Sequence, residues 1–405
     1  MTLEFEKLTD KVDEMARLAA EREKERTNNV EDLLEILEKY AESWGHIETA
    51  LTLADEKADE KVYRSARPLT HITPLNAAIP APAPPERATI VATDGSQIMP
   101  DRHAAHLYYL INIGGVIYEH GSGNAPLSFS QPDLHYPKNA REMATFLSSS
   151  GEVSVARDLR EIGTLAEKTW EHRHGKRPLL SILDQRLLYW PIGGDNDKSN
   201  YEVKKWMRAM TKIHDSGGLL AGYIDRPMTT AVITLLQTLE GAETPDSFGW
   251  KELGKRSKNG GLSDSSLFSR LLKPGERSAI FTHISPRNDD FVKFDEGNQV
   301  CFFYINPGFD GRSIARIDLP LWVAEDEEAV TAVHALIYDQ CQIIGDYPYV
   351  IARADEMAVV GRDDNQELNF LIDLKMQEYG ISTAMTAKLG SKNLARGGRT
   401  RHGGI

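Results

Sequence analysis

The segment that ends in Asp94-Gly95-Ser96 constrains the fold of this chain more than any other. Residues 88–93 are apolar or β-branched, an acid ends the run, and a glycine follows at once. The run 179–184 repeats the arrangement and ends in Asp184. Such runs are typical of buried strands. Carboxylates at the ends of buried strands repel one another and usually need cations to neutralise them. The pair therefore predicts a two-metal phosphodiesterase site.

Each aspartate also has a simpler interpretation. Gly95 allows a sharp turn, so Asp94 is either a metal ligand at the carboxyl edge of the sheet or the first residue of an Asx turn. Asp184 precedes Arg186, and an ion pair between the two would stabilise the acid without a metal. Two such acids on neighbouring strands support the metal-ligand interpretation more strongly than either acid does by itself.

A pair of magnesium or manganese ions needs three or four carboxylates. The helix predicted before Asp184 offers Glu161, Glu167 and Glu171. Glu161 lies beside the apolar stripe of that helix, whereas Glu167 and Glu171 fit its solvated face. Asp355 follows a short apolar segment, and by itself it fits a helix cap or a loop acid.

Composition sets wider limits. The chain has 405 residues, of which 41% are hydrophobic, enough for one large domain or two. No run of 18 apolar residues is present, so no membrane span is expected. Cys301 and Cys341 cannot form a zinc cluster by themselves and fit a reducing, cytoplasmic compartment.

Charge is distributed unevenly. The formal net charge is −13, and residues 1–62 hold 18 acids against 9 lysines and arginines. The acidity is therefore mostly a property of the N-terminal segment and does not exclude nucleic acid as a partner. Residues 388–402 carry five bases and no acid, so this end either follows a phosphate backbone or is a solvated, disordered tail.

The pattern predicts four segments. Residues 1–73 form a helical extension, because apolar residues recur every three or four positions in two series separated by the polar stretch 21–29. The two helices form either a helical hairpin or an interrupted long helix, and they either pack on the body of the protein or self-associate. A proline-rich linker covers 74–86, the main domain covers 87–392 with a flexible insertion at 241–277, and a basic tail covers 393–405.

Within the main domain, strands and helices are mixed. The expected strands cover residues 88–93, 104–113, 116–120, 179–184, 218–224, 278–284, 299–305, 313–318 and 356–360. The expected helices cover residues 152–173, 201–216, 228–240, 325–343 and 364–379. Hairpins together with strand–helix–strand units predict an α/β fold with a mixed sheet.

The ordered segments resemble the NurA nuclease domain. The resemblance rests on Ile-Val-Ala-Thr-Asp94-Gly-Ser, the acid-bearing helix, Leu-Leu-Ser-Ile-Leu-Asp184, Leu-Leu-Ala-Gly-Tyr-Ile-Asp225-Arg, Ala-Arg316-Ile-Asp-Leu-Pro, and Gly-Asp-Tyr347-Pro followed by Ala-Arg-Ala-Asp355. It covers about residues 87–392. It implies an RNase H-like mixed sheet flanked by helices, manganese-dependent processing of DNA ends, a homodimer, and a hexameric HerA-type ATPase as partner.

The resemblance also implies roles for single residues. Asp94 and Asp184 take the aspartate ligand positions, Glu161 the helix glutamate position, and Tyr347 the position of the site tyrosine. The family pattern has His where this chain has Asp355, and Gly where it has Gln185 after the second aspartate. A carboxylate remains a hard oxygen ligand, so Asp355 can still bind metal, but it cannot replace a neutral imidazole.

Two functions are therefore expected as alternatives. The first is a Mn²⁺- or Mg²⁺-dependent deoxyribonuclease, an exonuclease with possible endonuclease activity, that acts in end resection or repair. Asp94, Glu161, Asp184 and Asp355 would hold two ions, and Tyr347 and Arg316 would contact phosphate. The basic residues Lys388, Lys392 and Arg396 would contact DNA. The second is an adaptor of a DNA translocase with reduced catalysis, suggested by the missing histidine and the helical extension.

Overall fold

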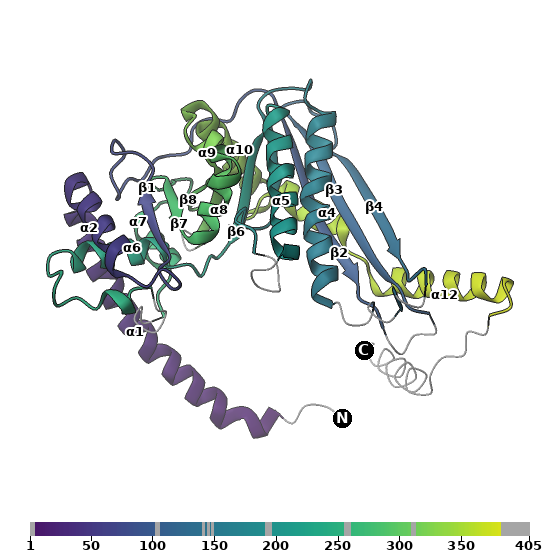
Figure 1. Cartoon of the computed structure of the whole chain (residues 1–405), viewed down its shortest axis with the longest axis horizontal. Helices are drawn as coiled ribbons and strands as arrows, with labels where there is room; N and C mark the ends of the chain where they lie inside the picture. Colours follow the sequence, from purple (N-terminus) through teal and green to yellow (C-terminus); the bar gives the residue numbers. More distant parts are fainter. Residues whose placement is uncertain are drawn as a thin grey trace. The chain divides into compact units, whose positions relative to one another are not determined.

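The computed structural model describes residues 5–101, 106–139, 142, 143, 146, 150–190, 197–254, 261–308 and 313–381. The chain divides into two compact units, and Figure 1 shows the strands and helices of each. Unit 1 takes its described residues from Met1–Glu86, Asp184–Leu188 and Leu219–Tyr349. Unit 2 takes them from Arg87–Leu183, Tyr189–Gly218 and Val350–Ile405.

Unit 2 contains a four-stranded part of the mixed sheet. Its strands are β2 (Ala88–Ile98), β3 (Tyr109–His120), β4 (Leu127–His135) and β5 (Leu179–Leu183), in the spatial order β5-β2-β3-β4. β2, β3 and β4 form an antiparallel meander, and β5 pairs with β2 in parallel. The predicted mixed α/β fold is confirmed.

The helices of unit 2 follow the predicted amphipathic pattern. They are α4 (Ser150–Glu171), α5 (Asp197–Asp215), α11 (Tyr349–Ala358) and α12 (Arg362–Glu378). α4 packs on β2, β3 and β5, and α5 lies beside α4 (Figure 1). The residues of α4 that are buried recur every three or four positions, as in Ile162, Leu165 and Thr169. This stripe fixes which side of α4 faces the sheet.

Unit 1 contains five antiparallel strands. They are β1 (Ser65–Pro68), β6 (Leu219–Asp225), β7 (Phe281–Ile284), β8 (Val300–Ile305) and β9 (Ala315–Pro320), in the order β1-β7-β8-β9-β6. Its helices are α1 (Thr9–Lys39), α2 (Trp44–Lys57), α6 (Ala231–Gly241), α7 (Asp264–Leu271), α8 (Pro286–Phe294), α9 (Leu321–Ala324) and α10 (Glu327–Ile344). The single-turn helices η1 (Phe5–Leu8), η2 (Trp250–Glu252) and η4 (Glu296–Asn298) join them.

The N-terminal segment packs on the rest of unit 1 over only part of its length. α1 runs through the polar stretch 21–29 without a break, so the predicted interruption there is wrong, and the chain turns at 40–43 instead. From Val30 onward, the apolar residues of α1 and α2 lie in one buried cluster with α6 and α7. Packing on the body is therefore the outcome for this part, whereas Phe5, Val12 and Met15 remain exposed.

Two further segments differ from the predicted organisation. Within the expected linker, Leu75 is fully buried and Ile79 exchanges backbone hydrogen bonds with Arg277, so this stretch packs against unit 1. Within the expected mobile insertion, residues 261–277 contain α7, whose Leu267 and Phe268 are fully buried. Residues 255–260 lie outside the described residues.

The local sequence pattern also predicts a hairpin turn and a strand that the structure does not have. The expected strands 104–113 and 116–120 do not form a hairpin around Gly114 and Gly115, because both glycines lie in the middle of the single strand β3. A Cβ at Gly114 would lie 2.1 Å from the backbone nitrogen of Ala358, so the glycine allows α11 to approach the sheet. The predicted strand 356–360 is wrong, because residues up to Ala358 belong to α11, whose end packs on Gly114.

The described helices include none that combines the length and apolar character needed to cross a membrane.

Candidate functional site

Asp94 lies where β2 emerges from the core. β2 is buried as far as Thr93 and partly exposed from Asp94 to Ile98. The strand does not turn at Gly95, as the sequence suggested, but continues to Ile98 in antiparallel pairing with β3. The Asx-turn interpretation of Asp94 is therefore wrong, and its carboxylate is presented from a continuous strand at the point where burial ends.

Asp184 is related to Asp94 through strand register. The last parallel pair between β2 and β5 joins Thr93 with Leu183. Asp94 and Asp184 are the residues that directly follow these two partners, and Asp184 is exposed. The two strand-end acids that the sequence singled out thus occupy equivalent positions in the register of their strands.

Glu161 is the glutamate of α4 that faces the sheet. It is 3% exposed, whereas Glu167 and Glu171 are exposed to solvent. The hydroxyl of Thr93 donates a hydrogen bond to the backbone carbonyl of Glu161 (3.3 Å). Since Asp94 follows Thr93, this contact joins the part of α4 that carries Glu161 to the part of β2 that carries Asp94.

An ion pair that the sequence did not single out lies beside these acids. Both Nε and Nη2 of Arg157 donate to Oδ1 of Asp158, at 3.1 and 2.6 Å. The stem of Arg157 covers Gly95, because a Cβ on that glycine would lie 2.8 Å from Cγ of the arginine. One turn of α4 separates Arg157 from Glu161, so the arginine belongs to the same site.

The pKa of the Arg157 guanidinium reflects the acids that surround it. Burial by itself lowers the pKa of this guanidinium. The hydrogen bond and charge of Asp158, followed by the charges of Glu161 and Asp94, outweigh this effect and raise the pKa overall. Arg157 is therefore a fixed cation whose charge interacts with all three carboxylates. Its local signal, an arginine one turn before a helix glutamate, is common in solvated helices, which is why it was missed.

Ser96 and α11 complete this side of unit 2. The Ser96 hydroxyl donates to the backbone carbonyl of Ala358, and the Asn112 side chain donates to the same carbonyl at 2.8 Å. These bonds satisfy a carbonyl at the end of α11 that has no partner in the helix. Asp355 lies in the last turns of α11 and is exposed. The serine of the Asp-Gly-Ser motif therefore anchors the helix that carries Asp355.

Tyr347 and Arg316 belong to unit 1. The Tyr347 ring packs edge-to-face on Tyr223, with centroids 5.3 Å apart, and is partly exposed. Arg316 is 4% exposed; its Nε donates to Asp318 (2.7 Å), and its guanidinium lies 3.9 Å from the centre of the Phe302 ring. This placement does not fit the expected contact of Arg316 with phosphate, because the side chain lies within the core of unit 1.

The remaining predicted DNA contacts, Lys388, Lys392 and Arg396, lie outside the described residues.

The donor set of unit 2 suits a hard cation in its chemistry. Asp94 and Glu161 offer carboxylate oxygens, which magnesium and manganese prefer. Within the described residues, no three His, Cys, Asp or Glu side chains are grouped closely enough to form a metal site. Asp94 and Glu161 therefore fit a divalent ion by the type of their donor atoms. Asp158 is instead paired with Arg157.

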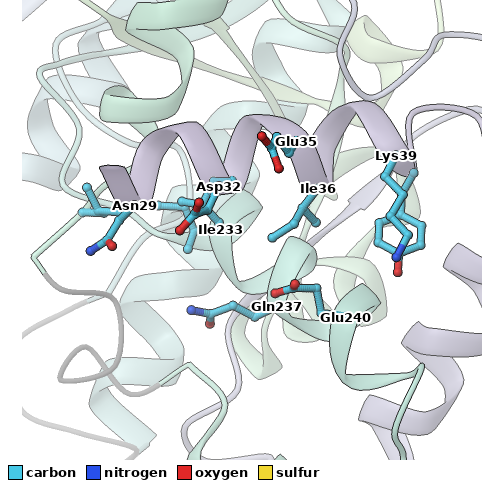
Figure 2. Close-up of a pocket in the computed structure, with 11 residues that line it drawn as sticks. Asn29, Asp32, Glu35, Ile36, Lys39, Ile233, Gln237 and Glu240 are labelled. Carbon is cyan, nitrogen blue, oxygen red and sulfur yellow. The ribbon is translucent and has the colours of Figure 1, made fainter. Parts of the chain in front are cut away.

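A groove in unit 1 is unrelated to this chemistry. It lies between α1 and α6, has a volume of about 720 Å³, and contains none of the candidate site residues (Figure 2). Asp32, Glu35 and Glu240 line it, and Lys39 at one end pairs with Glu243 (2.6 Å). No nucleophile or metal-binding group accompanies these residues in the lining of the groove, so we assign it no catalytic role.

Comparisons with known proteins give a match to one family and a likeness to one solved structure. A family model described as the NurA domain matches residues 88–360. Among solved structures, the crystal structure of the NurA nuclease from Sulfolobus solfataricus is similar, with 15% sequence identity and a TM-score of 0.42 over 85% of this chain and 97% of that chain. No curated protein matches the chain. The matched residues include the whole of β2, α4 and β5.

Proposed function

This chain belongs to the NurA domain family, and on that premise we propose that it is a metal-dependent nuclease that hydrolyses phosphodiester bonds in DNA. The observation that carries the proposal is the meeting of β2 and α4, where Thr93 bonds to the carbonyl of Glu161 and Asp94 follows directly. A partly exposed carboxylate beside a buried one, with an arginine whose charge interacts with both, is suited to phosphodiester chemistry.

The proposed ligands are Asp94, Glu161, Asp184 and Asp355, holding Mn²⁺ or Mg²⁺, with two ions in the active form. The parallel register of β2 and β5 supports the pairing of Asp94 with Asp184. The anchoring of α11 through Ala358 supports the participation of Asp355. When bound, the cations would supply activation of the attacking water and stabilisation of the leaving oxygen.

The protein itself would orient the substrate. Asp94 and Glu161 would hold their positions through the packing of α4 on β2, so little reorganisation accompanies binding. The Tyr347 hydroxyl would position a phosphate oxygen, as its place in the family pattern suggests. The basic residues Lys388, Lys392 and Arg396 would add non-specific backbone contacts.

We further infer that the enzyme works at DNA ends as a homodimer with a hexameric HerA-type ATPase, in the cytoplasm and in the course of end resection or repair. The support is membership of the family and the resemblance of the ordered motifs. Exonucleolytic hydrolysis, with endonucleolytic activity beside it, follows from the same resemblance.

A nuclease assay tests the proposal directly. Purified full-length protein should degrade linear DNA with Mn²⁺, with and without the ATPase, and chelation should stop it. Asp94→Asn, which removes a charge and keeps the shape, should lower the rate at least about 100-fold. Glu167→Gln removes a charge from the exposed face of the same helix and should keep the wild-type rate. Wild-type protein that is inert under every one of these conditions contradicts the proposal.

One observation favours a second candidate, a DNA-binding adaptor of a translocase with reduced catalysis. Asp355 stands where the family pattern has a histidine, and the described residues group no three ligands around one point. Calorimetric titration with Mn²⁺ separates the two functions. Binding that Asp184→Asn abolishes favours the nuclease, and the absence of Mn²⁺ binding by the wild-type protein favours the adaptor.

A further inference from the structure

The predicted phosphate-binding arginine is buried, and another arginine lies beside the acids. Arg316 is held in the core of unit 1 by Asp318. Arg157 on α4 keeps about a third of its side-chain surface exposed while its charge interacts with Asp94 and Glu161. A guanidinium that is both fixed and accessible next to catalytic carboxylates is what recognition of a phosphodiester requires.

Asp158 fixes the orientation of this guanidinium. Nε and one terminal nitrogen are both bound to a single oxygen of Asp158, and the stem packs on Gly95. Five N–H groups are available on an arginine, and this arrangement commits two of its three nitrogens to Asp158. The remaining nitrogen, Nη1, is a donor held in place by a neighbour that is itself only 19% exposed.

A buried hydroxyl beside the pair also lacks a partner. Tyr189 is 5% exposed and stacks on Trp206, with ring centroids 4.6 Å apart. Its hydroxyl makes no hydrogen bond within the described part of the chain. Burial raises the pKa of Tyr189, and the charges of Asp158 and Glu202 raise it further, so the phenol stays protonated and can donate. Buried donors are rarely left unsatisfied, and a bound ligand is one explanation.

We propose that Arg157 binds the phosphodiester group of the substrate, that Asp158 positions Arg157, and that the Tyr189 hydroxyl donates to the same phosphate-bearing ligand. This inference rests on the proposed nuclease function. It names Arg157 as the positively charged side chain of the same site that contacts the substrate phosphate. It assigns Arg157 contact with substrate, whereas Asp158 acts only through the arginine. All of these residues lie in unit 2.

The dependence of DNA affinity on salt tests the assignment. Full-length protein is titrated against fluorescein-labelled duplex DNA with Ca²⁺ in place of Mn²⁺, and anisotropy is read over a series of salt concentrations. Arg157→Ala should weaken binding about 10- to 100-fold, the loss of one charge-assisted hydrogen bond. It should also reduce the slope of log K against log salt by about one, because one phosphate contact is lost.

The matched variants separate contact from structure. Arg157→Lys keeps the charge and should keep the salt slope while losing part of the affinity. Asp158→Asn should weaken binding without changing the slope, since Arg157 remains charged. Tyr189→Phe should weaken binding a few-fold without changing the thermal midpoint of unfolding. Arg160→Ala, an exposed arginine on the same helix, should leave affinity and slope unchanged.

Three outcomes overturn the proposal. The first is wild-type affinity and slope in Arg157→Ala, and the second is an equal loss in Arg160→Ala. The third is a loss of affinity in Arg157→Lys that is accompanied by the same change in slope as in Arg157→Ala. If the wild-type protein binds and cleaves DNA in these cases, only the role of Arg157 fails. If the wild-type protein does neither, the proposed function fails together with it.

Discussion

The hydroxyl of Thr93 on β2 donates a hydrogen bond to the backbone carbonyl of Glu161 on α4. Both residues are buried, and the bond adds to the packing that holds α4 on the sheet. Because Asp94 follows Thr93, this contact joins the Glu161 backbone directly to the strand that carries the Asp-Gly-Ser motif. The position of Glu161 therefore follows from packing rather than from its place in the sequence alone.

A prediction about the three glutamates of α4 follows from this contact. Glu161→Gln should lower Mn²⁺-dependent hydrolysis of DNA by about 100-fold or more, because it removes a ligand charge. Glu171→Gln should change the rate less than about twofold, since that side chain is exposed. Rates measured on linear DNA check both variants. Equal losses of rate in the two variants would contradict the assignment of Glu161 as the catalytic glutamate of α4.

Two glycines of unit 2 should respond to alanine in opposite directions. At Gly114, a Cβ would lie 2.1 Å from the Ala358 backbone, so Gly114→Ala should destabilise the protein by about 1–3 kcal/mol and displace α11. At Gly163, in the middle of α4, a Cβ meets open space. Gly163→Ala should raise stability by about 0.5–1 kcal/mol, because alanine loses less backbone entropy in a helix. Urea unfolding measures both.

Arg316→Ala should act on stability rather than on DNA binding. The substitution leaves the fully buried Asp318 without its guanidinium partner, a loss of about 3–5 kcal/mol. Arg226→Ala is the control, since Arg226 is 77% exposed and its pair with Asp225 contributes less than about 1 kcal/mol. An Arg316→Ala protein with wild-type unfolding but weakened DNA binding would restore the role expected from the sequence.

The buried carboxylate of Asp264 should be a major determinant of the stability of unit 1. It accepts the Tyr304 hydroxyl at 2.6 Å and the backbone N–H groups of Val232 and Ile233 at the start of α6. Asp264→Ala leaves these buried donors unsatisfied and should cost about 2–4 kcal/mol. Tyr304→Phe removes the bond to Asp264 and the bond between the Tyr304 and Thr229 hydroxyls (3.0 Å), keeps the backbone donors satisfied, and should cost about 1–2 kcal/mol. Thermal unfolding of the two variants should rank them in this order.

His334 makes stability depend on pH. Its Nε2–H donates to the carbonyl of Gly275 in the core, and burial, assisted by the charge of Arg277, lowers its pKa from 6.5 to about 4. As pH falls below 6.5, the unfolded chain takes up a proton while the folded protein does not. The contribution is therefore present above pH 6.5 and is lost as pH falls towards 4, a change of about 3 kcal/mol.

Urea unfolding between pH 7 and 4 checks this dependence. His334→Gln should lose stability less steeply over this range, because glutamine does not titrate. His283, whose pKa burial lowers to about 3, acts in the same direction, so part of the dependence should remain in the variant. An unchanged pH profile in His334→Gln would contradict the assignment.

The sequence by itself determined the features that depend on neighbours along the chain. The alternation and the apolar runs gave β2 and β5 and placed Asp94 and Asp184 after them, since buried strands need continuous apolar residues. The 3.6-residue stripe of α4 placed Glu161 on the sheet-facing side and Glu167 on the other. These patterns are local, because each side chain's direction follows from its position in the same strand or helix.

Tertiary structure decided the remaining features of the site, because those features depend on atoms brought together from distant parts of the chain. The role of Gly114 is understood only once Ala358 lies against it, because the close approach comes from a helix, α11, that is distant in the sequence. Arg316 carries the charge that DNA requires, yet Asp318 and Phe302 surround it in the core. The local signal of Arg157, an arginine one turn before a helix glutamate, is too common to identify it, and only the packing of α4 on β2 places its guanidinium beside the acids of the Asp-Gly-Ser strand.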